Sequence, residues 1–126
     1  MNDFYYRELD AYQLAKQFAI QVCLLLRKFP EHERYILTDQ LRRSAISIPS
    51  NIAEGAGRMS IKERIHFYDI AYGSLFEALC QLEISKDFGY INVEDFSSME
   101  QIAARISMTI IALKRTLQEK MNKEQQ

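Results

Sequence analysis

The chain is poor in the residues that form turns and cross-links. Its 126 residues include only 4 glycines, 2 prolines and 2 cysteines, and no tryptophan. So few turn-forming residues predict long elements joined by short connections, which favours helices over a many-stranded sheet. Cys23 and Cys80 lie within helical patterns and lack the spacing of a zinc site. We therefore expect them to be small apolar fillers in a reducing compartment rather than a disulfide.

Long apolar runs and a targeting segment are also missing from the sequence. No apolar run approaches the roughly 20 residues that a bilayer-spanning helix needs. The opening residues, MNDFYYRELD, carry acids and tyrosines where a signal peptide has a basic start followed by an apolar stretch. These absences predict a cytoplasmic protein with no membrane partner. The length of 126 residues suits one domain over residues 1–126.

Charge is nearly balanced but unevenly distributed. The net charge is −1, yet residues 67–100 hold seven acids against one lysine, and residues 101–126 hold five bases against two acids. Strong non-specific binding to nucleic acid normally needs a clear basic excess. The balance therefore argues against such binding by the whole chain, while a local basic patch stays open as an alternative.

Apolar residues recur at three- and four-residue spacing along four segments. This periodicity predicts four amphipathic helices at about 9–28, 34–56, 61–88 and 93–120. Ser60 and Glu63 have the spacing of a capping box at the start of the third helix, Gly89 is placed to end it, and Asn92 to cap the fourth. Four such helices with short loops predict an all-α fold, an antiparallel up-down four-helix bundle.

A proline interrupts the second predicted helix. Pro49 removes one backbone donor and is expected to kink the helix axis. Ser44 and Asn51 fall on the apolar stripe of this helix, about one turn on either side of Ile48. Both are expected to form hydrogen bonds near the kink. We favour this structural interpretation over a ligand-binding role. Gly55 predicts close packing before the helix stops.

Apolar residues also occur off the main stripes of the first and third helices. A monomeric bundle should carry charged residues on its outer faces, and exposed apolar residues in numbers would exceed what a monomer tolerates. The pattern therefore predicts self-association through the outer faces of these two helices, with scattered surface residues as the alternative. The predicted interface residues are Ile20, Cys23, Leu24, Phe67, Ile70 and Phe76.

No catalytic, cofactor or metal constellation is evident in the sequence. Glu63 and His66 have the Glu-x-x-His spacing of di-iron bundles, but those bundles need two copies and further glutamates. Helical geometry also places this pair on the outer face, away from a core metal site. His32 lies in a polar turn, and neither cysteine is near a histidine in the sequence. We predict a protein that is not an enzyme and that holds no cofactor or metal.

Five bases lie on either side of Pro49 and in the turn that follows: Arg42, Arg43, Arg58, Lys62 and Arg64. One interpretation is that they form salt bridges with the acidic third and fourth helices, where each exposed pair contributes little. The other is a patch that faces nucleic-acid phosphates and is multiplied in a ring of subunits. We favour the first interpretation and keep the second as the alternative.

Three runs of the sequence, RRSAISIPSNIAEGAGR, YGSLFEALCQLEIS and DFGYI, resemble a four-helix-bundle family whose first members were encoded by intervening sequences inside bacterial large-subunit rRNA genes. The opening run LDAYQLA is also similar to the first helix of that family, so the resemblance covers nearly the whole chain. Its most specific parts are residues 47–55 and 73–75.

This resemblance implies a helical bundle that assembles into a ring, usually a homopentamer, with no catalytic activity assigned to the family. The family is also similar to the accessory proteins of diversity-generating retroelements, which are basic pentamers that bind nucleic acid. The charge of −1 sets this chain apart from those proteins. A homo-oligomeric scaffold is therefore the expected function, and a ring that binds rRNA or another nucleic acid is the alternative.

Overall fold

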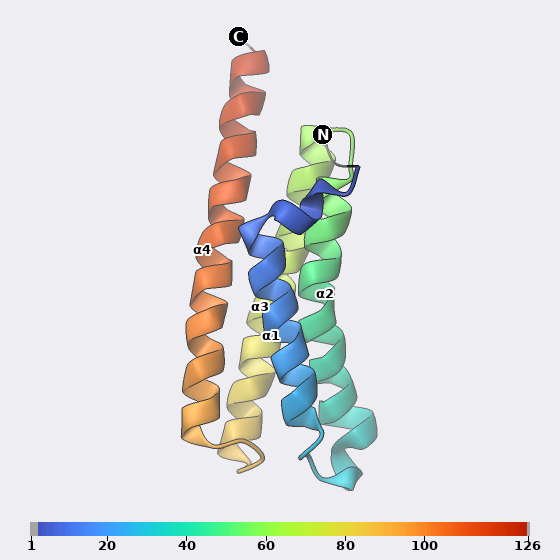
Figure 1. The fold of residues 1–126 in the computed structure, drawn as a ribbon, viewed down its shortest axis with the longest axis vertical. Coiled ribbons are helices and arrows are strands. Elements are labelled where there is room, and N and C mark those ends of the chain that lie inside the picture. The colour runs from blue at the N-terminus through green and yellow to red at the C-terminus, as the bar shows by residue number, and fades with distance from the viewer. Residues whose placement is uncertain (1–2, 126) are drawn as a thin grey trace.

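Four α-helices make up most of the chain in the computed structural model, which describes residues 3–125 (Figure 1). They are α1 (Asp10–Leu26), α2 (Asp39–Ala56), α3 (Ile61–Asp87) and α4 (Val93–Glu124). Short helical turns precede the first two: η1 (Tyr5–Glu8), η2 (Glu31–Glu33) and the π-helical η3 (Arg34–Thr38). No strand occurs within residues 3–125, and the all-α prediction is confirmed.

The four helices form one bundle. The colour ramp of Figure 1 passes down α1, up α2, down α3 and up α4, so successive helices run in opposite directions. Helix α2 packs against α1 and α3, and α4 packs against α3 and α1, which closes a ring of contacts around the core. The predicted bundle is confirmed, and the last turns of α4 project beyond the other helices.

The helix ends follow from local hydrogen bonds. Ser60 Oγ accepts from the Glu63 amide at 3.1 Å, and Asn92 Oδ1 accepts from the Asp95 amide at 2.7 Å. Gly89 has a φ of 84°, a conformation that favours glycine. The amides of Gly89 and Tyr90 donate to carbonyls within the last turn of α3, both at 2.9 Å, as in a Schellman motif.

Several boundaries differ from the predicted ones. The first helix ends at Leu26, before the predicted residue 28, and α4 continues to Glu124, beyond residue 120. Residues 34–38 are helical as predicted but form a wider π-turn before α2 begins at Asp39. The capping box is half formed, because the Glu63 carboxylate lies 3.8 Å from Arg58 Nη1.

Pro49 lies buried inside α2, which continues on both sides of it. The predicted polar cluster is present around it and reaches α3. Ser44 Oγ donates to Gln81 Oε1 at 2.8 Å, and the hydroxyls of Ser47 and Ser74 lie 2.8 Å apart. The Asn51 amide donates within its own helix, to the Ser47 carbonyl at 2.8 Å. The kink itself stays a prediction.

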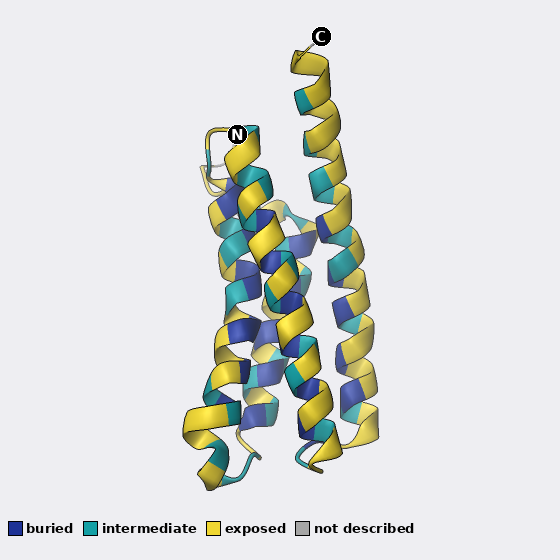
Figure 2. Cartoon of the chain, turned by 180° about the vertical axis from the view of Figure 1, so that it is seen from behind, coloured by how far each residue is buried: buried dark blue, intermediate teal, exposed yellow. Residues whose placement is uncertain are grey.

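The core lies between the inward faces of the four helices, where Figure 2 shows the buried residues. Its large, fully enclosed members include Phe18, Leu41, Ile48, Leu75 and Ile106. Many remaining inner positions carry only small side chains: Ala11, Ala15, Ala45, Ala71, Ala78 and Ala103. Small inner side chains let helices approach closely, since less volume separates the backbones.

The cysteines are both free, and only one fits the predicted role. Cys23 is half-buried at the side of α1. Cys80 is exposed, because it lies on the opposite side of α3 from the buried Leu75 and Leu82. The prediction that Cys80 fills the core is therefore wrong.

Gly55 marks the closest approach between α2 and α3. A Cβ atom placed there would lie 2.8 Å from Cε1 of Tyr68 and 3.0 Å from Cβ of Phe67. Real Cβ atoms need more room than this, so a larger residue forces the helices apart. The predicted close packing at Gly55 is confirmed.

We predict that Gly55→Ala destabilises the fold by about 1–3 kcal/mol, because the added methyl overpacks the α2–α3 contact. Gly73→Ala is the matched control, since a Cβ there meets no atom within 4 Å. That change should stabilise α3 by about 0.5–1 kcal/mol, the usual gain of alanine over glycine within a helix. Urea unfolding of both variants measures the difference, and equal effects would contradict the close approach.

Candidate interaction surfaces

The predicted interface residues divide into two groups. Ile20 and Phe76 keep 54% and 56% of their surface exposed, and Leu24 and Ile70 are also exposed. Phe67 is half-buried instead, because the Arg58 guanidinium lies over its ring at 4.6 Å from the centroid. Cys23 is half-buried as well. Four of the six residues therefore lie on the outer surface of the bundle, as the pattern predicts.

Further exposed apolar residues were missed by the sequence reasoning. Ile46 lies on the outer side of α2, and Met108 and Ile111 lie on the outer side of α4, with Met108 71% exposed. All three are off the core stripes of their helices. The search for apolar residues outside the main apolar stripe was limited to α1 and α3. The same search on α2 and α4 would have found these three residues.

Shallow grooves run along two of the helix pairs. The groove between α1 and α2, of about 270 Å³, is lined by Tyr12, Lys16, Ala19, Ile20, Pro49 and Ala53, among others. The groove between α3 and α4, of about 180 Å³, is lined by Leu75, Phe76, Leu79, Glu100, Ala104 and Ser107, among others. We call the surfaces around these grooves the α1/α2 face and the α3/α4 face.

The five predicted basic residues do not form one patch. Arg42 and Arg43 lie in the first turn of α2, whereas Arg58 lies just past its end. At 1.5 Å per helical residue, about 24 Å separates Arg42 from Arg58 along the axis. Arg43 is held by Asp39 of its own helix at 3.3 Å. Proximity to Pro49 in the sequence thus does not mean proximity in space.

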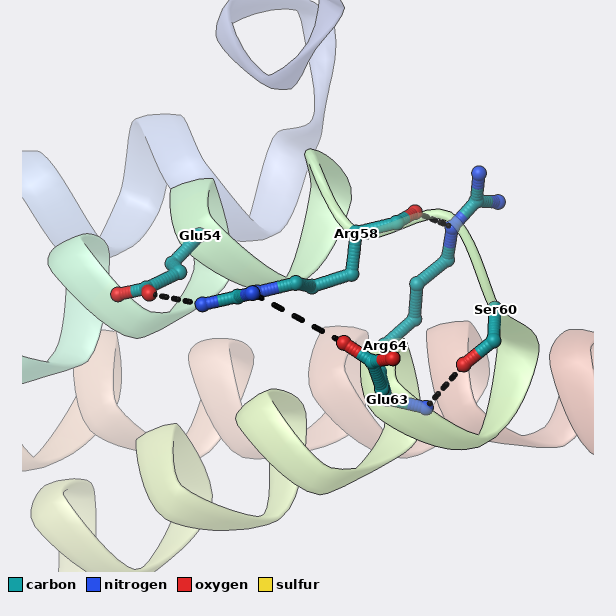
Figure 3. A network of polar contacts seen from close by, with 5 residues as sticks. All are labelled: Glu54, Arg58, Ser60, Glu63 and Arg64. Carbon is teal, nitrogen blue, oxygen red and sulfur yellow. Dashed lines mark hydrogen bonds and ion pairs between the residues drawn. The ribbon is translucent and has the colours of Figure 1, made fainter.

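Arg58 and Arg64 lie together at the α2–α3 turn (Figure 3), and Lys62 lies in the first turn of α3. Arg58 Nη2 binds Glu54 Oε1 at 2.6 Å, and Arg58 Nη1 lies 3.8 Å from Glu63 Oε2. Arg64 Nε donates to the Arg58 carbonyl at 2.8 Å. Arg58 is thus paired locally, with α2 and the start of α3. Lys62 forms no ion pair within the described part of the chain.

The candidate metal pair does not converge on a common point. His66 is exposed, with its ring 5.4 Å from that of Phe67, while the Glu63 carboxylate faces Arg58. No group of three or more His, Cys, Asp or Glu side chains within residues 3–125 has the arrangement to hold a metal ion. None of the described helices is long and apolar enough to cross a membrane.

The two loops at the lower end of the bundle in Figure 1 are joined through Tyr90. Its hydroxyl donates to Glu33 Oε2 at 2.8 Å, and its ring lies 5.4 Å from that of Phe88 and 5.3 Å from that of Phe29. The hydrogen bond to Glu33 raises the pKa of Tyr90, with smaller contributions from burial and from the Glu33 charge. His32 lies exposed beside it, as predicted.

An open cleft of about 460 Å³ lies at the other end, between η1, α3 and α4. Its lining includes Tyr5, Arg64, Tyr68, Leu113 and Leu117. The Tyr5 hydroxyl donates to the carbonyl of the last α2 residue at 2.7 Å, which holds η1 over the bundle. The pKa of Tyr68 is raised to about 12, mainly by burial and in smaller part by Tyr5, against a lowering effect of Arg64.

Comparison with known proteins assigns this bundle to a family. The family model described as 23S rRNA-intervening sequence protein matches residues 7–112. The chain belongs to this family. The matched region of the intervening-sequence protein runs from η1 through most of α4, so it includes both grooves and the α2–α3 turn.

One solved structure extends this comparison to the fold. The chain is similar to a protein of unknown function from the S23 ribosomal protein family of Bacteroides thetaiotaomicron VPI-5482, with a TM-score of 0.77 at 24% sequence identity. The likeness covers 82% of this chain and 97% of that one. At this identity it shows a shared fold. A comparison with curated proteins finds no match.

The raised pKa of Tyr68 predicts a pH-dependent loss of stability. Because the folded pKa lies above the ordinary value of 10, the stabilising contribution is complete below pH 10 and is lost as pH rises towards 12. Unfolding free energies at pH 9 and pH 12 should therefore fall by roughly 2 kcal/mol more for the natural chain than for Tyr68→Phe. Parallel pH profiles of the two proteins would contradict the burial argument.

Proposed function

We propose that this intervening-sequence protein is a non-enzymatic, homo-oligomeric scaffold. Five copies is the number that the family resemblance implies. The observation that carries the proposal is the exposure of large apolar side chains on the outer faces of the bundle, with Ile20, Phe76 and Met108 each more than half exposed. Complete burial of such a side chain contributes about 1.5–3 kcal/mol, so covering several of them favours association.

The placement of reactive side chains supports a role without catalysis. The two histidines lie at different ends of the bundle, one beside Tyr90 and the other beside Phe67. Cys80 and the Glu63–His66 pair lie on the exposed side of α3 rather than within a groove or the cleft. Catalysis usually requires such groups to converge in a site that excludes water. The outer surface instead offers apolar area suited to protein contacts.

The oligomeric state tests the proposal directly. Light scattering coupled to gel filtration at micromolar concentration should give a mass that is a multiple of 14.8 kDa, with five copies expected. Because apolar contacts persist at high ionic strength, the mass should not fall when salt is raised. A species of one copy at micromolar concentration would end the scaffold proposal, and a stable number other than five would remove the pentamer alone.

Binding to structured RNA is the second candidate function. The family description refers to 23S rRNA, and a stretch without acids covers most of the first and second helices. Residues 11–28 and 40–53 together hold five bases and no acid. Arg42 forms no ion pair with any described residue, so its guanidinium is available to a phosphate.

Titration of a structured rRNA fragment at two salt concentrations tests this candidate. Phosphate contacts predict a steep loss of affinity with salt, and the double change Arg42→Ala with Arg43→Ala should lower the log–log slope by about 1 for each contact removed. Arg105→Ala is the control, an exposed base on α4 outside the predicted group. An absence of binding at low salt would remove the RNA candidate.

A further inference from the structure

The two halves of the bundle differ in charge. Residues 11–28 and 40–53, which cover most of α1 and α2, hold five bases and no acid, whereas residues 67–100 hold seven acids and one lysine. Counted over the whole helices, with Arg27 and Lys28 after α1, residues 10–28 and 39–56 hold five bases and three acids, whereas residues 61–87 and 93–124 hold eight bases and ten acids. Since α1 and α2 pack together, and α3 packs with α4, one side of the molecule has a net charge of +2 and the other a net charge of −2. The protomer is therefore electrically polar across its width.

The α1/α2 face combines an apolar centre with a basic border. Lys16, Ile20, Cys23 and Arg27 follow the spacing of one helical stripe, so a base lies on either side of the apolar pair. Ile46 is exposed on the neighbouring helix. Lys16 and Arg27 form no ion pair within residues 3–125, and about 16 Å of helix separates them.

The α3/α4 face also has an apolar centre, with acids on its α3 side, while Arg105 and Arg115 follow the stripe of Met108 on α4. Asp69, Phe76 and Glu83 are spaced seven residues apart on one stripe of α3, so an acid lies on either side of the exposed ring. About 21 Å separates the two acids along the helix. Glu100 lines the groove beside Phe76, and Met108 is exposed on α4. Asp69 is bound by Lys114, whereas Glu83 and Glu100 form no ion pair among the described residues.

These two faces lie on opposite sides of the bundle. Contacts run from α1 to α2, α2 to α3, α3 to α4 and back to α1, so the α1–α2 pair and the α3–α4 pair form opposite sides of the ring. A protomer can thus use both faces at once, each with a different neighbour. A contact between two unlike faces is heterologous, and it repeats from subunit to subunit, as a ring where the rotation closes and as an open filament where it does not.

We infer that the α1/α2 face of one copy docks on the α3/α4 face of the next, with Ile20 and Ile46 against Phe76 and Met108. The inference rests on the proposed homo-oligomeric function and specifies which residues form the contact between copies. Pairing the α1/α2 face with itself would place Lys16 and Arg27 opposite bases of the other copy, which disfavours that arrangement. Docking unlike faces instead brings Lys16 and Arg27 towards Glu83 and Glu100 around an apolar centre.

Two variants, each blocked on one face, test this direction of assembly. One carries Ile20→Asp with Ile46→Asp, and the other carries Phe76→Asp with Met108→Asp, all at exposed positions. Each variant alone should be a single copy of about 14.8 kDa, since every contact needs both faces. Mixed in equal amounts, they should form a species of two copies, because each variant retains the face that the other lacks.

The mixture discriminates between heterologous and self-pairing contacts. If the variant blocked on α3 and α4 forms dimers alone, the α1/α2 face pairs with itself and the inference is overturned; the converse result has the same meaning. Monomers that stay single on mixing, or variants that keep the natural mass, also overturn it. If the unaltered chain is itself a single copy, the scaffold proposal fails, which is a different outcome from a wrong choice of faces.

Controls separate loss of contact from loss of fold. Met59→Asp with Val93→Asp makes the same chemical change at exposed positions outside both faces, and it should keep the natural mass. Circular dichroism should show unchanged helix content in every variant. Where a double variant loses helix content, the single changes Ile20→Asp and Phe76→Asp take its place in the same mixing experiment.

Discussion

The close contact between α2 and α3 determines how the rest of the bundle is built. Gly55 brings the two backbones together beside Tyr68, and the hydroxyls of Ser47 and Ser74 meet at 2.8 Å farther along. Ser44 adds a third link through Gln81. Buried polar groups must keep their partners, so these contacts fix the helices against sliding or rotation. The outward faces of both helices are fixed with them.

Close approach also explains why large apolar residues remain outside. Alanine, serine and glycine occupy many inner positions beside the large apolar side chains, so the helices pack closely and leave little spare volume between them. Ile20, Phe76 and Met108 have no place in it without pushing the helices apart. The apolar surface is thus a consequence of how tightly the helices pack, and the proposed contacts between copies would bury part of it.

Local sequence rules predicted the helices and their ends well. They did not predict contacts between residues that lie in different elements. The caps at Ser60 and Asn92 and the glycine at position 89 are recognisable in sequence because each depends on neighbours along the chain. The wide turn at 34–38 was missed because its apolar spacing continues that of α2. Phe67 was predicted to be outward, but Arg58 from the α2–α3 turn lies over its ring. Nothing in the local pattern specifies that contact.

The basic side of the bundle cannot serve two partners at once. If α1 and α2 dock on the α3/α4 face of another copy, their bases are occupied by carboxylates and are closed to phosphate. Arg58, Lys62 and Arg64 lie apart from that side, at the α2–α3 turn, so RNA bound by an assembled ring would have to contact them. Glu54 and Glu63 already neutralise much of Arg58 there. Assembly and strong RNA binding therefore oppose each other in this chain, and its net charge of −1 favours assembly.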